Sequence, residues 1–137
     1  MLASNSYSKA YVTGCRARVD AQVRAFRVIA KTHPRDPAFA AFEAAFFNNL
    51  VIVLESCFVH RARALEKQDS NPLNEVRVLA RSMMENDEAM VDDPVIKLNP
   101  SKTVLKHEVG DPIRLTEHDF GLLAKAFFAD LESKYVA

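Results

Sequence analysis

One segment governs the architecture of this 137-residue chain: Phe39-Ala-Ala-Phe-Glu-Ala-Ala-Phe-Phe-Asn-Asn-Leu-Val-Ile-Val-Leu54. Placed on a helix at about 100° per residue, it is apolar on nearly every side. In a soluble protein such a helix is normally the central member of a bundle, covered on several sides by other helices. Asp36 is a good N-cap and Pro37 a good first helical residue, so we predict a long helix over residues 37–68.

One-sided apolar stripes indicate more helices on both sides of this segment. They predict helices over residues of about 6–31, 72–86 and 116–134. Asn71 and Pro72 supply a cap and a first residue for the helix that begins at 72. Thr116 and Asp119 have the spacing of a capping box at the start of the last helix. The chain therefore offers three helices to cover the long one.

The segment between the last two helices has a different pattern. Within residues 94–115, short β-favouring runs alternate with turn signals that contain Pro and Gly, and we predict a small β element there. The length and the ordinary composition fit one domain over residues 1–137. The predicted fold class is mainly α: a four-helix bundle-like domain with a long central second helix and a β insertion between helices 3 and 4.

Composition and patterning favour a cytoplasmic protein. Cys15 and Cys57 lie on apolar helix faces, where free thiols behave as small hydrophobes, and two cysteines make no disulfide framework. No signal-peptide pattern is visible at the start of the chain. The long helix has nearly the length of a membrane span, but Glu43 and Glu55 interrupt it, so we do not expect it to cross a membrane.

The net charge is zero, but its distribution along the chain is uneven. Residues 1–36 carry five more basic than acidic side chains, and the remainder carries five more acidic than basic ones. We expect the basic first helix to face the acidic remainder or solvent; nucleic-acid binding is the alternative. Arg27 and His33 also have the Arg-x(4–6)-His spacing of HEPN ribonucleases, a pattern that arises easily by chance.

Two charged residues fall on the apolar face of the long helix, where a charge needs a partner or a pocket. Glu43 and Arg61 are too far apart on one helix to pair with each other. Arg77 and Arg81 are the candidate partners for Glu43 or Glu55, and Glu75 is the candidate for Arg61. For Arg61, exposure at the helix end by snorkelling is the favoured interpretation.

The same residues allow a polar pocket between helices 2 and 3. Its candidate ligand-binding residues are Glu55, His60, Arg61, Asn74 and Arg77, with Arg81 as a further member. The arginines would bind a small anion, and a histidine is suited to proton transfer near neutral pH. A structural hydrogen-bond network that holds the helix pair is the favoured interpretation of this set.

Other chemistries find no support in the sequence. No Glu has a His three positions later and no His-x-x-x-His occurs, so we predict no metal site. Only three isolated glycines are present, which excludes a Gly-rich phosphate loop. Neither cysteine has the setting of a nucleophile. We therefore predict no cofactor and assign no catalytic residue, and the sequence leaves open whether any catalysis occurs.

Several stretches resemble a small bacterial protein family with no assigned activity. They are residues 46–54, His60-Arg61 and Asn71-Pro-Leu-Asn-Glu-Val-Arg77, followed by residues 109–115 and 127–131. The resemblance covers residues 39–131 and implies a bacterial helical domain, with no catalytic residues to carry over.

Together these observations predict a non-enzymatic helical binding or assembly domain that forms a homodimer. The reason is the surplus of aromatic and aliphatic residues around the second helix, which three other helices cover only in part. The first alternative is a small-anion sensor or enzyme that uses the polar pocket. The second is nucleic-acid binding or HEPN-like RNA processing through the basic first helix.

Overall fold

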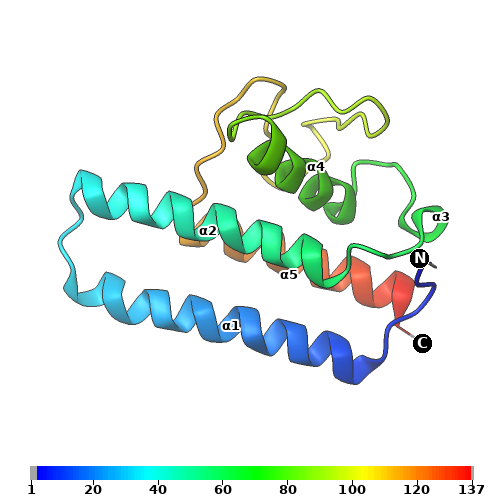
Figure 1. The fold of residues 1–137 in the computed structure, drawn as a ribbon, viewed down its shortest axis with the longest axis horizontal. Coiled ribbons are helices and arrows are strands. Elements are labelled where there is room, and N and C mark those ends of the chain that lie inside the picture. Colours follow the sequence, from blue (N-terminus) through cyan, green and yellow to red (C-terminus); the bar gives the residue numbers. More distant parts are fainter. Residues whose placement is uncertain (1–2, 137) are drawn as a thin grey trace.

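The computed structural model of the chain describes residues 3–136 and is mainly helical (Figure 1). Its elements are α1 (Lys9–Thr32), α2 (Pro37–Cys57), a single turn α3 (Arg63–Glu66), α4 (Pro72–Glu85) and α5 (Glu117–Tyr135). α2 and α5 lie side by side at the centre, with α4 packed on one side of this pair and α1 on the other. The prediction of a mainly α protein with four packed helices is confirmed.

The starts of α2, α4 and α5 are where the sequence predicted them, to within one residue. Asp36 and Asn71 cap α2 and α4 through side-chain oxygens that accept backbone N–H bonds from the first turn. Thr116 and Asp119 form a complete capping box at α5. α1 begins at Lys9, three residues later than predicted.

The core lies where α2 meets the other three long helices. Phe47, Leu50 and Leu54 of α2 are almost fully buried, and Phe47 contacts the rings of Phe26 in α1 and Phe120 in α5. At about 25 cal/mol for each Å² of apolar surface removed from water, these side chains contribute a large share of the folding free energy. The apolar middle of the long segment is therefore ordinary core on the sides that face its neighbours.

The predicted long helix is wrong in its last third, because α2 ends at Cys57 and not near residue 68. Phe58 leaves helical geometry, and the chain turns before the short α3. Arg61 in this turn bridges to Ser4, whose N–H donates to His60 O at 2.7 Å. Residues 61–68 are good helix formers, whereas Phe58, Val59 and His60 are weaker ones, so burial and pairing in the folded molecule outweigh the local propensity of the later residues.

Both ends of the described chain meet this turn. Besides the pairing at Ser4, Tyr7 bridges to Val136 beside the end of α5. The Tyr135 hydroxyl donates to Ala62 O at 2.6 Å. Figure 1 shows the start of α1 and the end of α5 at the same end of the molecule as α3. The two terminal segments thus hold the turn after α2. Because these contacts come from residues distant in the sequence, residues 58–68 alone do not predict the turn.

The predicted β element is also wrong: across residues 3–136 the structure has no β-strand, and the 94–115 segment is irregular. Some of its backbone N–H groups bind side chains, and others bind carbonyls in turns or in residues 88–90. Glu75 of α4 accepts N–H bonds from Val104 and Leu105 at 2.7 and 2.9 Å. The only pairing near this segment is an isolated bridge, Ala89 to Pro112.

Candidate functional site

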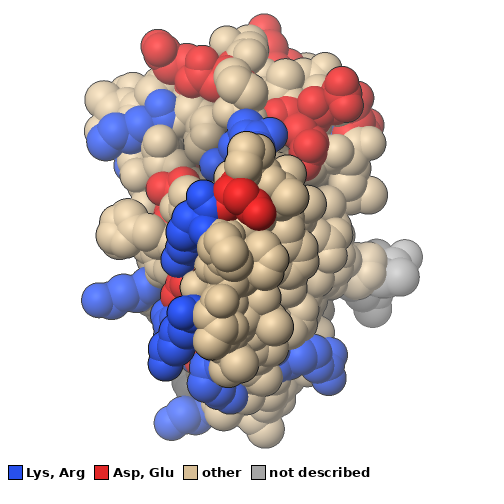
Figure 2. All heavy atoms as spheres, turned by 90° about the vertical axis from the view of Figure 1, so that its left-hand side faces the viewer, with Lys and Arg blue, Asp and Glu red and all other residues tan. Residues whose placement is uncertain are grey.

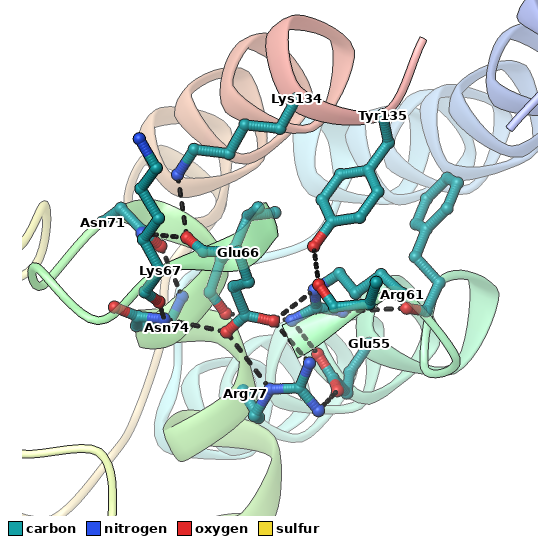
Figure 3. Close-up of polar contacts among 12 residues, drawn as sticks. Glu55, Arg61, Glu66, Lys67, Asn71, Asn74, Arg77, Lys134 and Tyr135 are labelled. Atoms are coloured by element: carbon teal, nitrogen blue, oxygen red, sulfur yellow. Dashed lines mark hydrogen bonds and ion pairs between the residues drawn. The ribbon is translucent and has the colours of Figure 1, made fainter. Parts of the chain in front are cut away.

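A buried network of charged and amide side chains lies where α2, α3, α4 and α5 meet (Figure 3). Arg61 is its centre and is 2% exposed. Its Nε donates to Glu66 at 2.8 Å, and its Nη2 donates to Glu55 at 2.9 Å. The remaining bonds of the guanidinium go to the carbonyls of Phe58 and Leu73 at 3.0 Å each. The predicted snorkelling of Arg61 is therefore wrong.

Arg77 completes the network from α4. Its Nη2 lies 2.5 Å from Glu66 and its Nη1 3.3 Å from Glu55, so each carboxylate contacts both arginines. Asn74 donates to the second carboxylate oxygen of Glu66 at 2.8 Å. Two positive and two negative groups balance one another, and we call these five residues the Arg61 network. A buried ion pair is tolerated when its charges and hydrogen bonds are satisfied in this way.

The two carboxylates of the network respond differently to burial. Burial acts to raise the pKa of Glu66, but the hydrogen bond from Arg77 and the charges of both arginines outweigh it, and this pKa lies below its ordinary value. Burial dominates at Glu55 and raises its pKa despite the same arginines. Of the two carboxylates, Glu66 therefore holds its negative charge more firmly than Glu55.

Four of the five predicted ligand-binding residues meet in this network: Glu55, Arg61, Asn74 and Arg77. His60 does not, because its side chain is exposed and only its backbone is engaged, by Ser4. The predicted pairing of Arg77 with Glu55 is confirmed. In place of an open pocket, the arginines meet carboxylates and carbonyls at hydrogen-bond distance. The set can hold four elements together, and its neutral charge gives an anion little attraction.

Glu66 is the member that the sequence analysis missed. A continuous helix over 37–68 gives it no reason to meet Arg61, and only the turn after Cys57 brings the two together. The same turn explains why Lys134 donates to Glu66 O at 3.0 Å. The sequence indicated that Asn71 caps a helix. It did not indicate the second hydrogen bond of Asn71, in which Nδ2 donates to Glu66 O at 2.7 Å.

Other partner predictions have mixed outcomes. Glu75 does not pair with Arg61, since it binds the backbone of the 94–115 segment. Arg81 pairs with Asp93 at 2.8 Å instead of with Glu43 or Glu55. Glu43 accepts the N–H of Glu117 at 2.9 Å at the start of α5.

The basic side chains of α1 are partly neutralised within the molecule. Arg16 pairs with Glu132 and Arg27 pairs with Glu117, both on α5. His33, the other half of the HEPN-like spacing, stacks on Phe39 at the α1–α2 turn. Within residues 3–136 no group of three potential ligands lies close enough to hold a metal ion.

A second feature is the side of α2 that the other helices cover only in part, where Phe42 and Phe46 stack on Phe26 of α1. Its exposed and half-buried residues are Ala38, Ala41, Phe42, Ala45, Phe46, Asn49, Ile52, Val53 and Ser56. We call this set the α2 face. It runs the length of the helix and contains no charged residue. Figure 2 looks onto the α1–α2 turn, and its right-hand flank, the side toward the reader in Figure 1, shows few charged side chains.

By length and composition, α2 also passes as a helix that could cross a membrane. This is weak evidence, because the core helix of a soluble protein has the same properties, and part of α2 is buried against its neighbours. Comparisons with known proteins find no matching family model, no similar curated protein and no similar solved structure. The resemblance to a small bacterial family therefore stays a prediction.

Proposed function

We propose that this protein is a non-enzymatic assembly module that pairs with a second copy of itself through the α2 face. The observation that carries this proposal is a partly exposed helix face, six turns long, without one charged side chain. Surface helices of monomeric proteins carry charged and polar residues on the side away from the core. An extended uncharged face marks an interaction site.

The composition of the face favours a second helix as the occupant. Ala38, Ala41 and Ala45 form a flat strip along its middle, which lets another backbone approach closely. Phe42, 45% exposed, stands beside this strip and can pack against the partner. Asn49 and Ser56 are its only polar residues.

A second copy is the occupant that best fits the charge and the size of this face. Two uncharged faces match each other without ion pairs, and a two-fold arrangement brings the same patch of each chain together. Neighbouring Tyr11 and Ile29 of α1 are also exposed, at 46% and 50%, and widen the surface. A contact about 31 Å long and two helices wide offers roughly 600 Å² per copy, near the ~800 Å² of an ordinary stable interface.

The alternatives have weaker support. Anion binding by the Arg61 network would compete with two carboxylates already in contact with both arginines. Nucleic-acid binding by α1 would use a helix whose Arg16 and Arg27 already pair with α5. The Arg61 network therefore has no free positive charge, and two of the basic side chains of α1 are already neutralised.

Light scattering coupled to size exclusion tests the proposal with a matched pair of variants. Phe42 and Leu122 are equally exposed, at 45% and 46%, but Leu122 lies on α5, away from the α2 face. We expect Phe42→Lys and Ala45→Arg to give monomers with unchanged helicity, because an unpaired charge at the centre of an interface is strongly unfavourable. Leu122→Lys should remain dimeric. Dimers in all three variants would overturn the proposal, and so would a wild-type monomer that floats with lipid vesicles.

A further inference from the structure

A cavity of about 260 Å³ lies between α4 and the irregular segment that follows it. Its hydrocarbon walls include Val78, Met90, Ile96 and Leu98. An apolar cavity of about 150 Å³ is enough to hold benzene. This one therefore has room for a ring of that size and one or two more heavy atoms.

One polar group in the cavity wall lacks a partner. The imidazole of His107 lines the cavity, and its buried Nδ1 has no hydrogen bond. Among residues 3–136, Nε2 has none either. Burial lowers the pKa of His107, against the charges of Asp111 and Asp119, so the ring is neutral at pH 7 and has an acceptor nitrogen.

The charged groups around the cavity have a negative surplus. Asp92, Asp93, Glu108 and one cation, Lys97, line it. Lys97 pairs with Asp92 at 2.9 Å and Arg81 pairs with Asp93 at 2.8 Å, so these charges largely cancel and the surplus rests on Glu108. The side chain of Glu108 has no ion-pair partner among residues 3–136. The rim thus favours a cation, while the walls favour a hydrocarbon.

We propose that this cavity binds a small primary amine with a compact apolar body, of the size of benzylamine. The body occupies the space beside Val78, Met90 and Ile96, and the ammonium lies at the rim, where it donates to His107 and Glu108. This site is independent of the α2 face, because its residues lie on α4 and in the segment after it.

Amide chemical shifts in a ¹H–¹⁵N spectrum, followed during titration, test this proposal with three probes of one shape: benzylamine, benzyl alcohol and benzoate. We expect benzylamine to shift the residues around the cavity with a dissociation constant on the order of 1 mM, ordinary for so small a ligand. Benzyl alcohol should bind more weakly and benzoate weakest, because the rim repels its charge.

Two variants locate the binding. Glu108→Gln should lower the affinity for benzylamine about tenfold, which is the loss expected when a charge-assisted hydrogen bond is removed. The affinity for benzyl alcohol should stay unchanged. Glu132→Gln, an acid on α5 outside the cavity, is the matched control and should change neither. The proposal is overturned if benzoate binds as well as benzylamine, if no probe shifts the cavity residues, or if both variants behave like the wild type.

Discussion

At the residue scale, Arg61 shows both what the sequence contains and what it lacks. Its position on an apolar stripe correctly indicated that its charge needed a partner from elsewhere. The identity of the main partner, Glu66, depends on the turn at residues 58–62, where helix-forming residues leave the helix. Charge and periodicity therefore predicted that Arg61 needs partners, and the turn at residues 58–62 determines which residues they are.

Removal of Arg61 should unfold the molecule more readily than removal of any surface arginine. We expect Arg61→Met to lower the free energy of unfolding by about 3–5 kcal/mol, because Glu55 and Glu66 then stay buried with one cation between them. Denaturant unfolding followed by circular dichroism measures this change. Arg63→Met, at an exposed position two residues later, is the control and should change little. Equal effects of the two substitutions would contradict a structural role for the Arg61 network.

The pH dependence of stability should separate Glu66 from Glu75. The folded-state pKa of Glu66 lies below its ordinary value of 4.5, so its contribution is present above that pH and is lost as the pH falls through the lowered pKa. Burial raises the pKa of Glu75 above 4.5, so ionised Glu75 destabilises the fold, and this destabilisation is relieved as the pH falls.

Urea unfolding between about pH 7 and pH 3 tests these signs in Glu66→Gln and Glu75→Gln. The advantage of the wild type over Glu66→Gln should shrink as the solution is acidified. Over the same range, the stability of the wild type relative to Glu75→Gln should grow. Parallel trends in the two variants would contradict the opposite directions of the two pKa shifts.

At the element scale, the helix starts and the ends of α1, α4 and α5 were predictable to within a few residues, and the end of α2 was not. Asp36, Asn71 and Thr116 act through bonds within their own first turn, so a short window of sequence contains the whole signal. The end of α2 depends on Ser4 and Tyr135, which are distant in the chain. The irregular 94–115 segment depends in the same way on Glu75 of α4, which replaces the hydrogen bonds of a strand.

The two Asx caps should differ in their effect on stability. Asp36 caps α2 only, whereas Asn71 caps α4 and also donates to Glu66 O. We expect Asp36→Ala to cost about 1 kcal/mol and Asn71→Ala about 2 kcal/mol, because the second variant loses a cap and a further hydrogen bond. Thermal and denaturant unfolding of both variants give the comparison. A smaller effect at Asn71 would show that its bond to α3 contributes nothing.

At the scale of the whole molecule, the α2 face is the feature that the fold leaves unexplained. The sequence indicated that three helices would cover the long helix only in part, and α1, α4 and α5 do leave one side of it open. It could not show which side, because that depends on how the helices pack. The absence of charge along the open side makes self-association the central claim about this protein.

Sedimentation equilibrium of the wild-type protein tests this claim most directly. At concentrations from about 1 to 100 µM, a range that covers ordinary specific interfaces and weaker ones, we predict a species of twice the 15.4 kDa chain mass. The dimer should dissociate on dilution, without loss of helicity. A single species of 15.4 kDa across the whole range would contradict self-association through the α2 face.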